Sequence, residues 1–409
     1  MSTRARGVGV SVLVLAGASA LVSACSSLPT WQDVSESAAT LGSTRVALYV
    51  SPQSYLWGGP GHVILGQDAT TPLKALKTSD MDNARLTWTH RGLFFSDTRR
   101  DYLLGDRLAT TDSPKTNSQV VAFSSPDGSS TWSLLIEGLT GDTYTEQAIT
   151  FNGEVSVRYD VDGFNQPIAR CRDGIFGVAI LAGPSNVKKA AGRGVVSSNG
   201  SDMPQMLTRL HPPAFEPGGA FVAAVPAYMV DYFWNDAACD ADGNAIFLAK
   251  DNHVDAPKTF EIRTWNVRTG KLTRHALRLP DASEPSMDTS RPVFFGRADR
   301  VLHDGKLMWI DSDGGVHLTD PATGATTLAF TTGVALRESD EYSLMRFERT
   351  WLLIRQIDEN PDLPMILHRF DTSTGAGQII AELPSIQREL SAALVLRDFA
   401  VAPELLAAP

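Results

Sequence analysis

The sequence lacks an excess of positive charge, and after residue 24 it lacks any apolar run long enough to span a bilayer. Of its 409 residues, 36 are Lys or Arg and 46 are Asp or Glu, so the formal net charge is −10. This acidic balance argues against a nucleic-acid partner and against a polybasic membrane patch. Hydrophobic residues make up 43% of the chain, which is enough for a packed core and excludes a disordered protein.

Linear motifs for catalysis or metal binding are also missing. The sequence has no His-Glu-x-x-His, no Gly-x-Ser-x-Gly and no phosphate-cradling glycine loop. The stretch from Asp240 to Asn244 alternates like a calcium loop but lacks the glycine at the sixth position, so we interpret it as a hairpin tip. Ser185 and Lys188 fit Ser-x-x-Lys, but no Lys-Thr-Gly follows. We expect neither a metal nor a cofactor.

The first 24 residues have the pattern of an export signal. Arg4 and Arg6 precede an uncharged run from Gly7 to Ala24, and a positive start followed by an apolar stretch and small residues is typical of secretory signals. Removing residues 1–24 takes away these two arginines and no acid, so the formal charge changes from −10 to −12. We therefore expect the folded part of the chain to lie outside the cytoplasm.

The stretch Val22-Ser23-Ala24-Cys25 resembles the lipobox of bacterial lipoproteins, in which an aliphatic residue and two small residues precede a lipidated cysteine. The resemblance implies that Cys25 carries a diacylglycerol thioether, becomes the mature N-terminus and anchors the protein to the extracytoplasmic side of a cell membrane. Two acyl chains give a stable anchor, whereas one holds weakly. The alternative is an ordinary signal peptide followed by an incidental cysteine.

Only two further cysteines are present, Cys171 and Cys239. If Cys25 is lipidated, an even number remains in an often oxidising compartment, which favours a disulfide between them. The alternative is two buried free thiols that act as small hydrophobic side chains. Both cysteines lie just before a predicted first turn, at matching places in neighbouring blades, and matching inner strands can be too far apart for the Cα limit of a disulfide, about 7 Å.

A turn pattern recurs three times in the second half of the chain. Asn266–Gly270, Asp320–Gly324 and Asp371–Gly375 all read Asx-x-x-Thr-Gly, and their glycines are 54 and 51 residues apart. The Asx side chain accepts hydrogen bonds from backbone N–H groups two or three residues on, and glycine adopts the left-handed conformation that closes a hairpin. The pattern therefore predicts the same hairpin at a nearly constant period.

Around the middle copy, the chain reads as four short strands within about fifty residues. Turns at His303–Gly305 and Asp311–Gly315 separate the apolar runs Leu307–Ile310 and Val316–Leu318. A meander of this length that repeats is typical of the blade of a β-propeller. Similar first turns occur upstream at residues 90–92, 126–128, 172–174 and 240–243.

We predict an all-β fold, a β-propeller of four-stranded antiparallel blades over residues 45–409, with about seven blades and six or eight as alternatives. The late run Ala392–Val401 is expected to pair with Arg45–Val50 and close the ring. Residues 25–44, rich in Ser, Ala and Thr, are expected to form a lipidated tether. A Gly-, Ser- and Pro-rich stretch at about 184–217 is expected to be an insertion.

We expect this protein to bind an envelope protein or a glycan as a non-catalytic scaffold or recognition module, because propellers present loops on a rigid frame. Lys188, Lys189 and Arg193 make the insertion locally basic on an acidic protein, so it is the candidate contact loop. In length, lipobox and Asp-x-x-Thr-Gly turn, the chain loosely resembles the propeller lipoproteins that serve as scaffolds in outer-membrane protein assembly. It lacks the Trp that often follows that turn in them.

The alternative is an extracellular enzyme that acts on glycans through carboxylates in the central channel. The sequence does not single out a pair among its 46 acids, so no catalytic residue is assigned. A quinone-dependent dehydrogenase is a third hypothesis, and the missing repeat tryptophans weigh against it. Five tryptophans could line a sugar or peptide site, but their strand spacing is typical of the core between blades: Trp57, Trp88, Trp132, Trp234 and Trp265.

Overall fold

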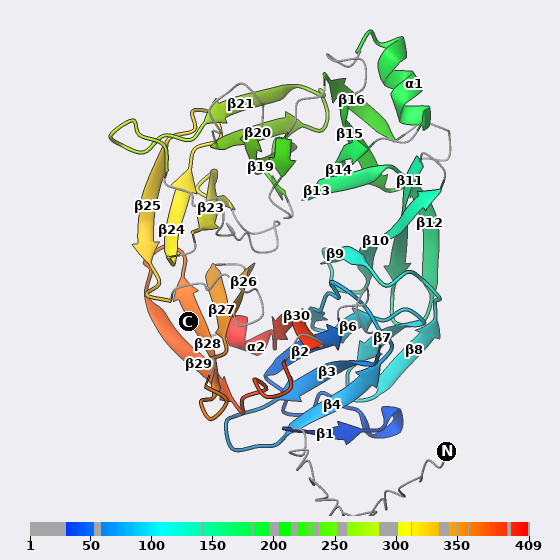
Figure 1. The fold of residues 1–409 in the computed structure, drawn as a ribbon, viewed down its shortest axis with the longest axis vertical. Coiled ribbons are helices and arrows are strands. Elements are labelled where there is room, and N and C mark those ends of the chain that lie inside the picture. The colour runs from blue at the N-terminus through cyan, green and yellow to red at the C-terminus, as the bar shows by residue number, and fades with distance from the viewer. Residues whose placement is uncertain are drawn as a thin grey trace, which may run out of the picture.

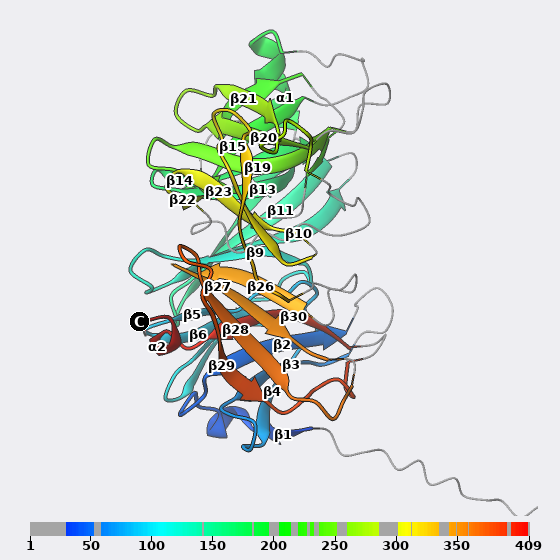
Figure 2. The same ribbon diagram turned by 90° about the vertical axis from the view of Figure 1, so that its left-hand side faces the viewer.

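The chain forms a seven-bladed β-propeller in which each blade is a four-stranded antiparallel sheet, as predicted (Figure 1). Figure 2 shows the same ring from its side. The description rests on a computed structural model. It covers residues 30–52, 59–140, 143–181, 184–195, 204–213, 220–226, 230–232, 237–251, 260–285, 302–311, 313–334, 343–348, 350–358, 360–390 and 394–407.

Blade 1 joins the two ends of the described chain. Its innermost strand, β30, is the last strand of the chain, and its other strands come from the N-terminal part of the described chain. From the axis outward the order is β30-β2-β3-β4, with β1 added at the outer edge. Their bounds are β30 Leu394–Val401, β2 Val46–Pro52, β3 Gly61–Gly66, β4 Leu73–Thr78 and β1 Trp31–Val34.

Blades 2, 3 and 4 follow in sequence order, each with its first strand innermost. Blade 2 contains β5 Thr87–Thr89, β6 Gly92–Ser96, β7 Arg100–Leu104 and β8 Leu108–Asp112. Blade 3 contains β9 Gln119–Ser124, β10 Thr131–Thr140, β11 Thr143–Phe151 and β12 Ser156–Asp162. Blade 4 contains β13 Phe164–Cys171, β14 Gly174–Leu181, β15 Gln205–His211 and β16 Phe221–Val225, with helix α1 Pro184–Gly192 between β14 and β15.

Blades 5, 6 and 7 complete the ring. In blade 5, β17 Val230–Tyr232 and β18 Ala238–Cys239 both pair with β19 Asn244–Asp251, and β20 Phe260–Asn266 and β21 Leu272–Ala276 follow. Blade 6 contains β22 Leu302–His303, β23 Lys306–Ile310, β24 Gly315–Thr319 and β25 Thr326–Thr331. Blade 7 contains β26 Ser343–Glu348, β27 Trp351–Gln356, β28 Met365–Asp371 and β29 Gly377–Leu383, and α2 Glu404–Ala407 follows β30.

The three repeated turns connect the two outer strands of blades 5, 6 and 7, as predicted. In the last of them, the Asp371 carboxylate accepts the N–H groups of Ser373 and Thr374 at 2.9 and 2.8 Å. Gly375 has φ +71° and donates its N–H to the Asp371 carbonyl at 2.8 Å. The left-handed glycine is required there, because an added Cβ would lie 2.6 Å from Phe330 of the neighbouring blade.

The ring closes where the sequence predicted. Strand β30 pairs antiparallel with β2, from Val46 opposite Val401 to Pro52 opposite Leu394. Every residue of β2 and most residues of β30 are buried, and both strands are mainly apolar, with Arg397 and Asp398 as the charged residues of β30. The core lies between blades: Trp309 is fully buried in a cluster that also contains residues of blades 5 and 7. Trp132 and Trp265 are buried core residues too, whereas Trp57 and Trp234 lie outside the described residues.

The tether predicted over residues 25–44 is wrong from Trp31 onward. Strand β1 pairs in parallel with β4, and Trp31 is buried in the core of blade 1. The short helix η1 Glu36–Ala38 follows, and Ala39 is buried as well. The few apolar residues of this segment show no regular period in the sequence, yet Trp31, Val34 and Leu41 all pack against the hydrophobic core.

The insertion predicted at about 184–217 is shorter than expected. Strand β15, Gln205–His211, is the third strand of blade 4, and most of its side chains are buried. Before it, α1 replaces the expected loop and packs Ala190 against Met206 and Phe221. The Gly, Ser and Pro content of the flanking residues concealed the alternating strand between them.

Cys171 and Cys239 are joined by a disulfide with Cα atoms 5.2 Å apart. They end the inner strands of blades 4 and 5, which approach closely near the axis: the Ala237 N–H donates to the Ile168 carbonyl at 2.7 Å. The matching inner strands thus lie within the distance limit for a disulfide, although the sequence left open that they would be too far apart. In the part of the chain that the structure describes, no helix is long and apolar enough to cross a membrane.

Replacing both cysteines with serine should lower the free energy of unfolding by about 2–4 kcal/mol, because the bridge closes a long loop between residues 68 apart. Chemical denaturation with and without reductant measures this. Reductant should shift the unfolding midpoint of the native chain and leave the double variant unchanged. Two titratable thiols in the denatured, unreduced native protein would contradict the bridge.

Candidate functional site

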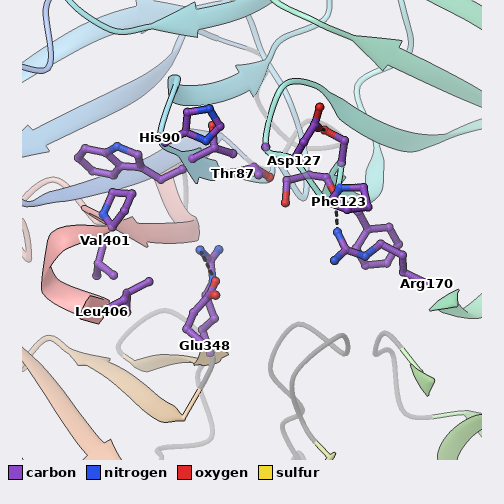
Figure 3. A pocket seen from close by; sticks show the side chains of 16 residues that line it. Thr87, His90, Phe123, Asp127, Arg170, Glu348, Val401 and Leu406 are labelled. Carbon is purple, nitrogen blue, oxygen red and sulfur yellow. Dashed lines mark hydrogen bonds and ion pairs between the residues drawn. The ribbon is translucent and has the colours of Figure 1, made fainter. Parts of the chain in front are cut away.

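A cavity of about 220 Å³ opens at one end of the ring axis. Its walls come from the inner strands of five blades, β5, β9, β13, β26 and β30, together with the first turns of blades 2 and 3 (Figure 3). We call this cavity the axial mouth. Because one strand from each of several blades contributes, the ring places residues from 87 to 406 around one space.

Two cationic side chains line the axial mouth. Arg170, near the end of β13, donates to the carbonyl of Ser124 on the neighbouring inner strand. Arg346, on β26, is buried and forms an ion pair with Asp398 of β30, with its Nη2 atom 2.8 and 2.9 Å from the two carboxylate oxygens. Both guanidinium groups therefore bridge adjacent blades as well as bordering the cavity.

The Asp398 carboxylate ties three consecutive blades together beneath the axial mouth. It accepts Arg346 from blade 7, and it also accepts the backbone N–H of Leu86, at the start of blade 2, at 2.8 Å. The Arg346 guanidinium lies over the ring of Phe399, 5.3 Å from its centroid. Nη1 of Arg346 is also 3.8 Å from the carboxylate of Glu348, which lines the cavity.

A second carboxylate, Asp127, stands on the first turn of blade 3. It is exposed and accepts the hydroxyl groups of Ser125 and Ser129 at 2.6 and 2.8 Å and the Ser129 N–H at 3.1 Å. These hydrogen bonds, with that from Ser125 the largest effect, lower the pKa of Asp127 to about 2. The group is therefore ionised at neutral pH and cannot donate a proton as a general acid.

Aromatic and apolar side chains complete the walls. Trp88 and Phe123 come from β5 and β9, and His90 is exposed on the first turn of blade 2. Leu406 of α2 forms part of another wall (Figure 3). The C-terminal segment is held in place by Trp351, whose indole N–H donates to the carbonyl of Leu406 at 3.0 Å.

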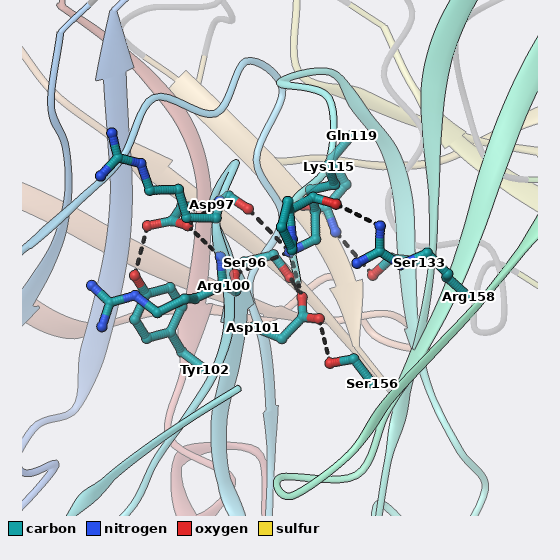
Figure 4. Close-up of polar contacts among 12 residues, drawn as sticks. Ser96, Asp97, Arg100, Asp101, Tyr102, Lys115, Gln119, Ser133, Ser156 and Arg158 are labelled. Atoms are coloured by element: carbon teal, nitrogen blue, oxygen red, sulfur yellow. Dashed lines mark hydrogen bonds and ion pairs between the residues drawn. The ribbon is translucent and has the colours of Figure 1, made fainter. Parts of the chain in front are cut away.

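A separate polar cluster lies between blades 2 and 3 (Figure 4). The fully buried Lys115 ammonium lies 3.0 Å from Asp101 and donates to the carbonyls of Asp97 and Arg100 at 3.1 Å. Burial lowers the pKa of Lys115, and the nearby Asp101 charge opposes this effect. An ammonium group has three donors, and all three have protein partners here, so we assign the cluster a structural role.

The candidate contact residues lie elsewhere. Lys188 and Lys189 are exposed on α1. This helix follows the C-terminal end of β14, whereas the first turn of blade 4 lies at the other end of that strand. Arg193 is partly committed to packing, because its guanidinium lies 4.8 Å from the Phe221 ring centroid and donates to the Val222 carbonyl at 3.2 Å. The structure does not bring these residues to the axial mouth. Cys25 lies outside the described residues.

Sequence reasoning did not identify Arg170, Arg346 or Glu348. They come from different inner strands and have no common spacing, so no linear motif marks them. The position of Arg170, two residues before the predicted first turn at 172–174, was a usable signal, whereas no first turn was predicted for the blade that carries Arg346 and Glu348. The aromatic Trp88 was singled out, and it is the one described tryptophan of that set that lines the cavity.

The geometry of the axial mouth suits binding more than proton transfer. Ionised groups of both signs stand beside aromatic surface, an arrangement that can orient a polar or charged partner. A glycosidase needs one carboxyl group kept protonated beside a second, ionised one. Asp127 is ionised at neutral pH, and the Glu348 carboxylate lies 3.8 Å from Nη1 of Arg346. Among the described residues, no group of three or more His, Cys, Asp and Glu side chains is placed to hold a metal ion.

A different acid, Glu146 on β11, is buried between blades 3 and 4 away from the axial mouth. Its Oε2 atom accepts the backbone N–H and the side-chain amide of Asn165 at 3.2 and 2.9 Å. Its Oε1 atom has no hydrogen-bond partner. Burial raises the pKa of Glu146 from 4.5 to about 8, and the hydrogen bonds from Asn165 oppose this only in part.

No family model matches this chain, and no curated protein matches it in sequence. It is similar in structure to apocarotenoid oxygenase from Synechocystis, at 11% identity and TM-score 0.44, over 91% of this chain and 95% of that one. It is also similar to AztD from Citrobacter koseri, at 10% identity and TM-score 0.39, over 87% and 89%. A quinoprotein alcohol dehydrogenase-like protein from Bacteroides thetaiotaomicron has 9% identity and TM-score 0.41, over 92% and 98%. These values are too low to carry a functional argument.

Replacing Asp398 with Asn should lower the free energy of unfolding by about 3 kcal/mol, because it removes the nearer of the two carboxylates that pair with the buried Arg346 charge. Denaturant unfolding monitored by tryptophan fluorescence measures the loss. The double variant R346M/D398L, which removes both charges, should be closer to the native chain than D398N. A D398N variant as stable as the native protein would show that the pair does not hold the ring.

Glu146 should make the protein less stable as pH rises from about 4.5 to 8. In that window the folded state keeps the Glu146 proton and the unfolded state has lost it, so the folded state loses relative stability. The variant E146Q should flatten this dependence and be about 2–4 kcal/mol more stable than the native chain at pH 8. The exposed-site variant E154Q is the control, and equal pH slopes for all three proteins would contradict the assignment.

Proposed function

We propose that this chain is a bacterial lipoprotein held on the extracytoplasmic side of a cell membrane through Cys25, and that its propeller binds a protein or glycan partner at the axial mouth without transforming it. The lipid anchor rests on the lipobox pattern of residues 22–25. The binding role rests on one structural observation: a mixed-charge cavity with aromatic walls, built from the inner strands of five blades.

The cavity is supported by groups that are already fixed. Arg346 is held by Asp398, Arg170 contacts Ser124, and Asp127 is bound within its own turn. A partner therefore meets side chains that lose little conformational freedom on binding, which lowers the entropic cost of association. The same hydrogen bonds and ion pairs do not favour acid–base catalysis, because a general acid or base works best with a pKa near the operating pH.

Catalysis on a glycan is the second candidate, and it is favoured only by the presence of Asp127 and Glu348 in one cavity. A retaining or inverting glycosidase would use Glu348 as the acid and Asp127 as the base or nucleophile. Under this alternative, both E348Q and D127N abolish the release of reducing sugar from envelope glycans. Under the binding proposal, the native chain releases none.

A second contact through α1 remains part of the proposal. Lys188 and Lys189 are exposed and cationic on a chain with net negative charge. They would steer an acidic partner by long-range attraction, an effect that decreases with salt. Because α1 and the axial mouth are separate, one partner would have to span both sites, or two partners would bind.

Photo-crosslinking in intact cells tests the binding site. A photoreactive amino acid replaces the exposed His90 at the axial mouth, and matched variants carry it at exposed Asp160 on the outer strand β12 or at Lys188 on α1. The lipidated protein is then purified under denaturing conditions, and attached molecules are identified by mass spectrometry. We expect a recurrent adduct from position 90 that is absent from position 160.

The outcomes separate the alternatives. An adduct from position 188 alone would move the contact to α1 and contradict the axial mouth as the site. Recovery of the chain without adducts at any position would contradict a macromolecular partner. Release of sugar by the purified soluble form, lost in E348Q, would favour the enzyme instead.

A further inference from the structure

The segment that begins at Thr30, five residues after the proposed lipid anchor at Cys25, is attached to the outer edge of the propeller. The Thr30 backbone N–H donates to the Glu389 carboxylate at 2.6 Å, and its hydroxyl group donates to the same oxygen. Trp31 is 7% exposed and contacts the ring of His62, with centroids 5.4 Å apart. Thr30 and Trp31 are thus part of the folded body.

Strand β1 and the residues after it continue this attachment around the rim. Four consecutive residues, Trp31 to Val34, pair in parallel with Leu73 to Leu76 of β4. Glu36 then forms a two-point ion pair with Arg100 of blade 2, at 2.7 and 3.0 Å. Ala39 is buried, and the Leu41 N–H donates to the Gly105 carbonyl at 2.9 Å.

Little chain separates this clamp from the lipid. Cys25 is five residues before Thr30, and a fully extended chain advances at most about 3.6 Å per residue. Whatever conformation the intervening residues adopt, the Cα atoms of Cys25 and Thr30 are therefore within about 18 Å of each other. A diacylglycerol at Cys25 places its acyl chains in the bilayer, so Thr30 is confined to the neighbourhood of the headgroups.

We propose that the propeller docks edge-on against a lipid surface, with the rim formed by β1 and η1 facing the headgroups and α1 at the far end of the molecule. In Figures 1 and 2, β1 and α1 lie at opposite ends of the long axis. The inference rests on the proposed lipid anchor at Cys25 and adds the orientation of the body. It leaves the axial mouth facing along the membrane rather than into it, and it holds Lys188 and Lys189 away from the bilayer.

The rim carries little net charge that would bind it to lipid independently. Asp33 and Glu36 are exposed, as are Lys74 and Lys77 of β4, and Arg100 pairs with Glu36. These two acids and three bases leave a formal charge of only +1, so attraction to anionic headgroups contributes little. The orientation thus follows from the short connection and the clamp, and it is expected to be insensitive to salt.

Energy transfer from the protein to the membrane tests this orientation. The full-length lipidated chain is reconstituted into phosphatidylcholine vesicles whose headgroups carry an acceptor dye. A donor dye is attached to a cysteine introduced at exposed Ser35, beside β1, or at exposed Lys188 on α1. We expect several-fold stronger transfer from position 35 than from position 188, with no change at high salt.

A third protein distinguishes the clamp from simple anchoring. It carries a flexible insertion of about twenty Gly and Ser residues between Pro29 and Thr30, which leaves the lipid and the folded body intact. The difference between positions 35 and 188 should disappear in this variant. Equal transfer from both positions in the chain without the insertion would overturn the proposal.

Flotation of the same samples with vesicles separates this inference from the proposed function. A protein that floats through Cys25 but shows equal transfer from both positions retains the lipid anchor and loses the orientation. A protein whose mass shows no lipid at Cys25, and which does not float, overturns both. The variant C25S, which has no lipidation site, is the control for flotation.

Discussion

The pairing of β30 with β2 is the constraint on which the rest of the molecule depends. It makes the C-terminal strand the inner strand of a blade whose outer strands come from the start of the chain. A blade has apolar faces that only neighbouring blades can cover, and this pairing gives the first and last blades their neighbours. Asp398 on β30 reinforces the closure by holding Arg346 of blade 7 and the entrance to blade 2.

The candidate site is a product of that closure. Thr87, from an early blade, and Leu406, from the end of the chain, border the same cavity. Its charged side chains also hold blades together, since Arg170 and Arg346 each contact a neighbouring inner strand. Under the proposed function, recognition and stability use the same residues, and a partner would meet a frame that is rigid before it binds.

Much of the fold was predictable because turns leave local chemical signals. The Asx-x-x-Thr-Gly pattern, as at Asp320–Gly324, identified hairpins, and the period of this pattern indicated blades. A late apolar run indicated that the last strand closes the ring with the first. Two boundaries were wrong because composition over a long window concealed short ordered elements. Trp31 and the pairing of β1 with β4 fix the segment expected to be a tether, and β15 lies within the expected insertion. The axial mouth was not predictable, since Arg346 and Arg170 become neighbours of one cavity only through the complete ring.

Hydrogen exchange on the protein, free and bound to its captured partner, tests the central claim that the axial mouth is the recognition surface. Amides in inner strands are protected by the closed ring in both states, so a partner should add protection mainly in the exposed turns. The account predicts slower exchange at residues 90–92, 125–129 and 403–407, with the amides of β12 unchanged. Added protection confined to α1 and the rim, with no change in the first turns of blades 2 and 3, would contradict it.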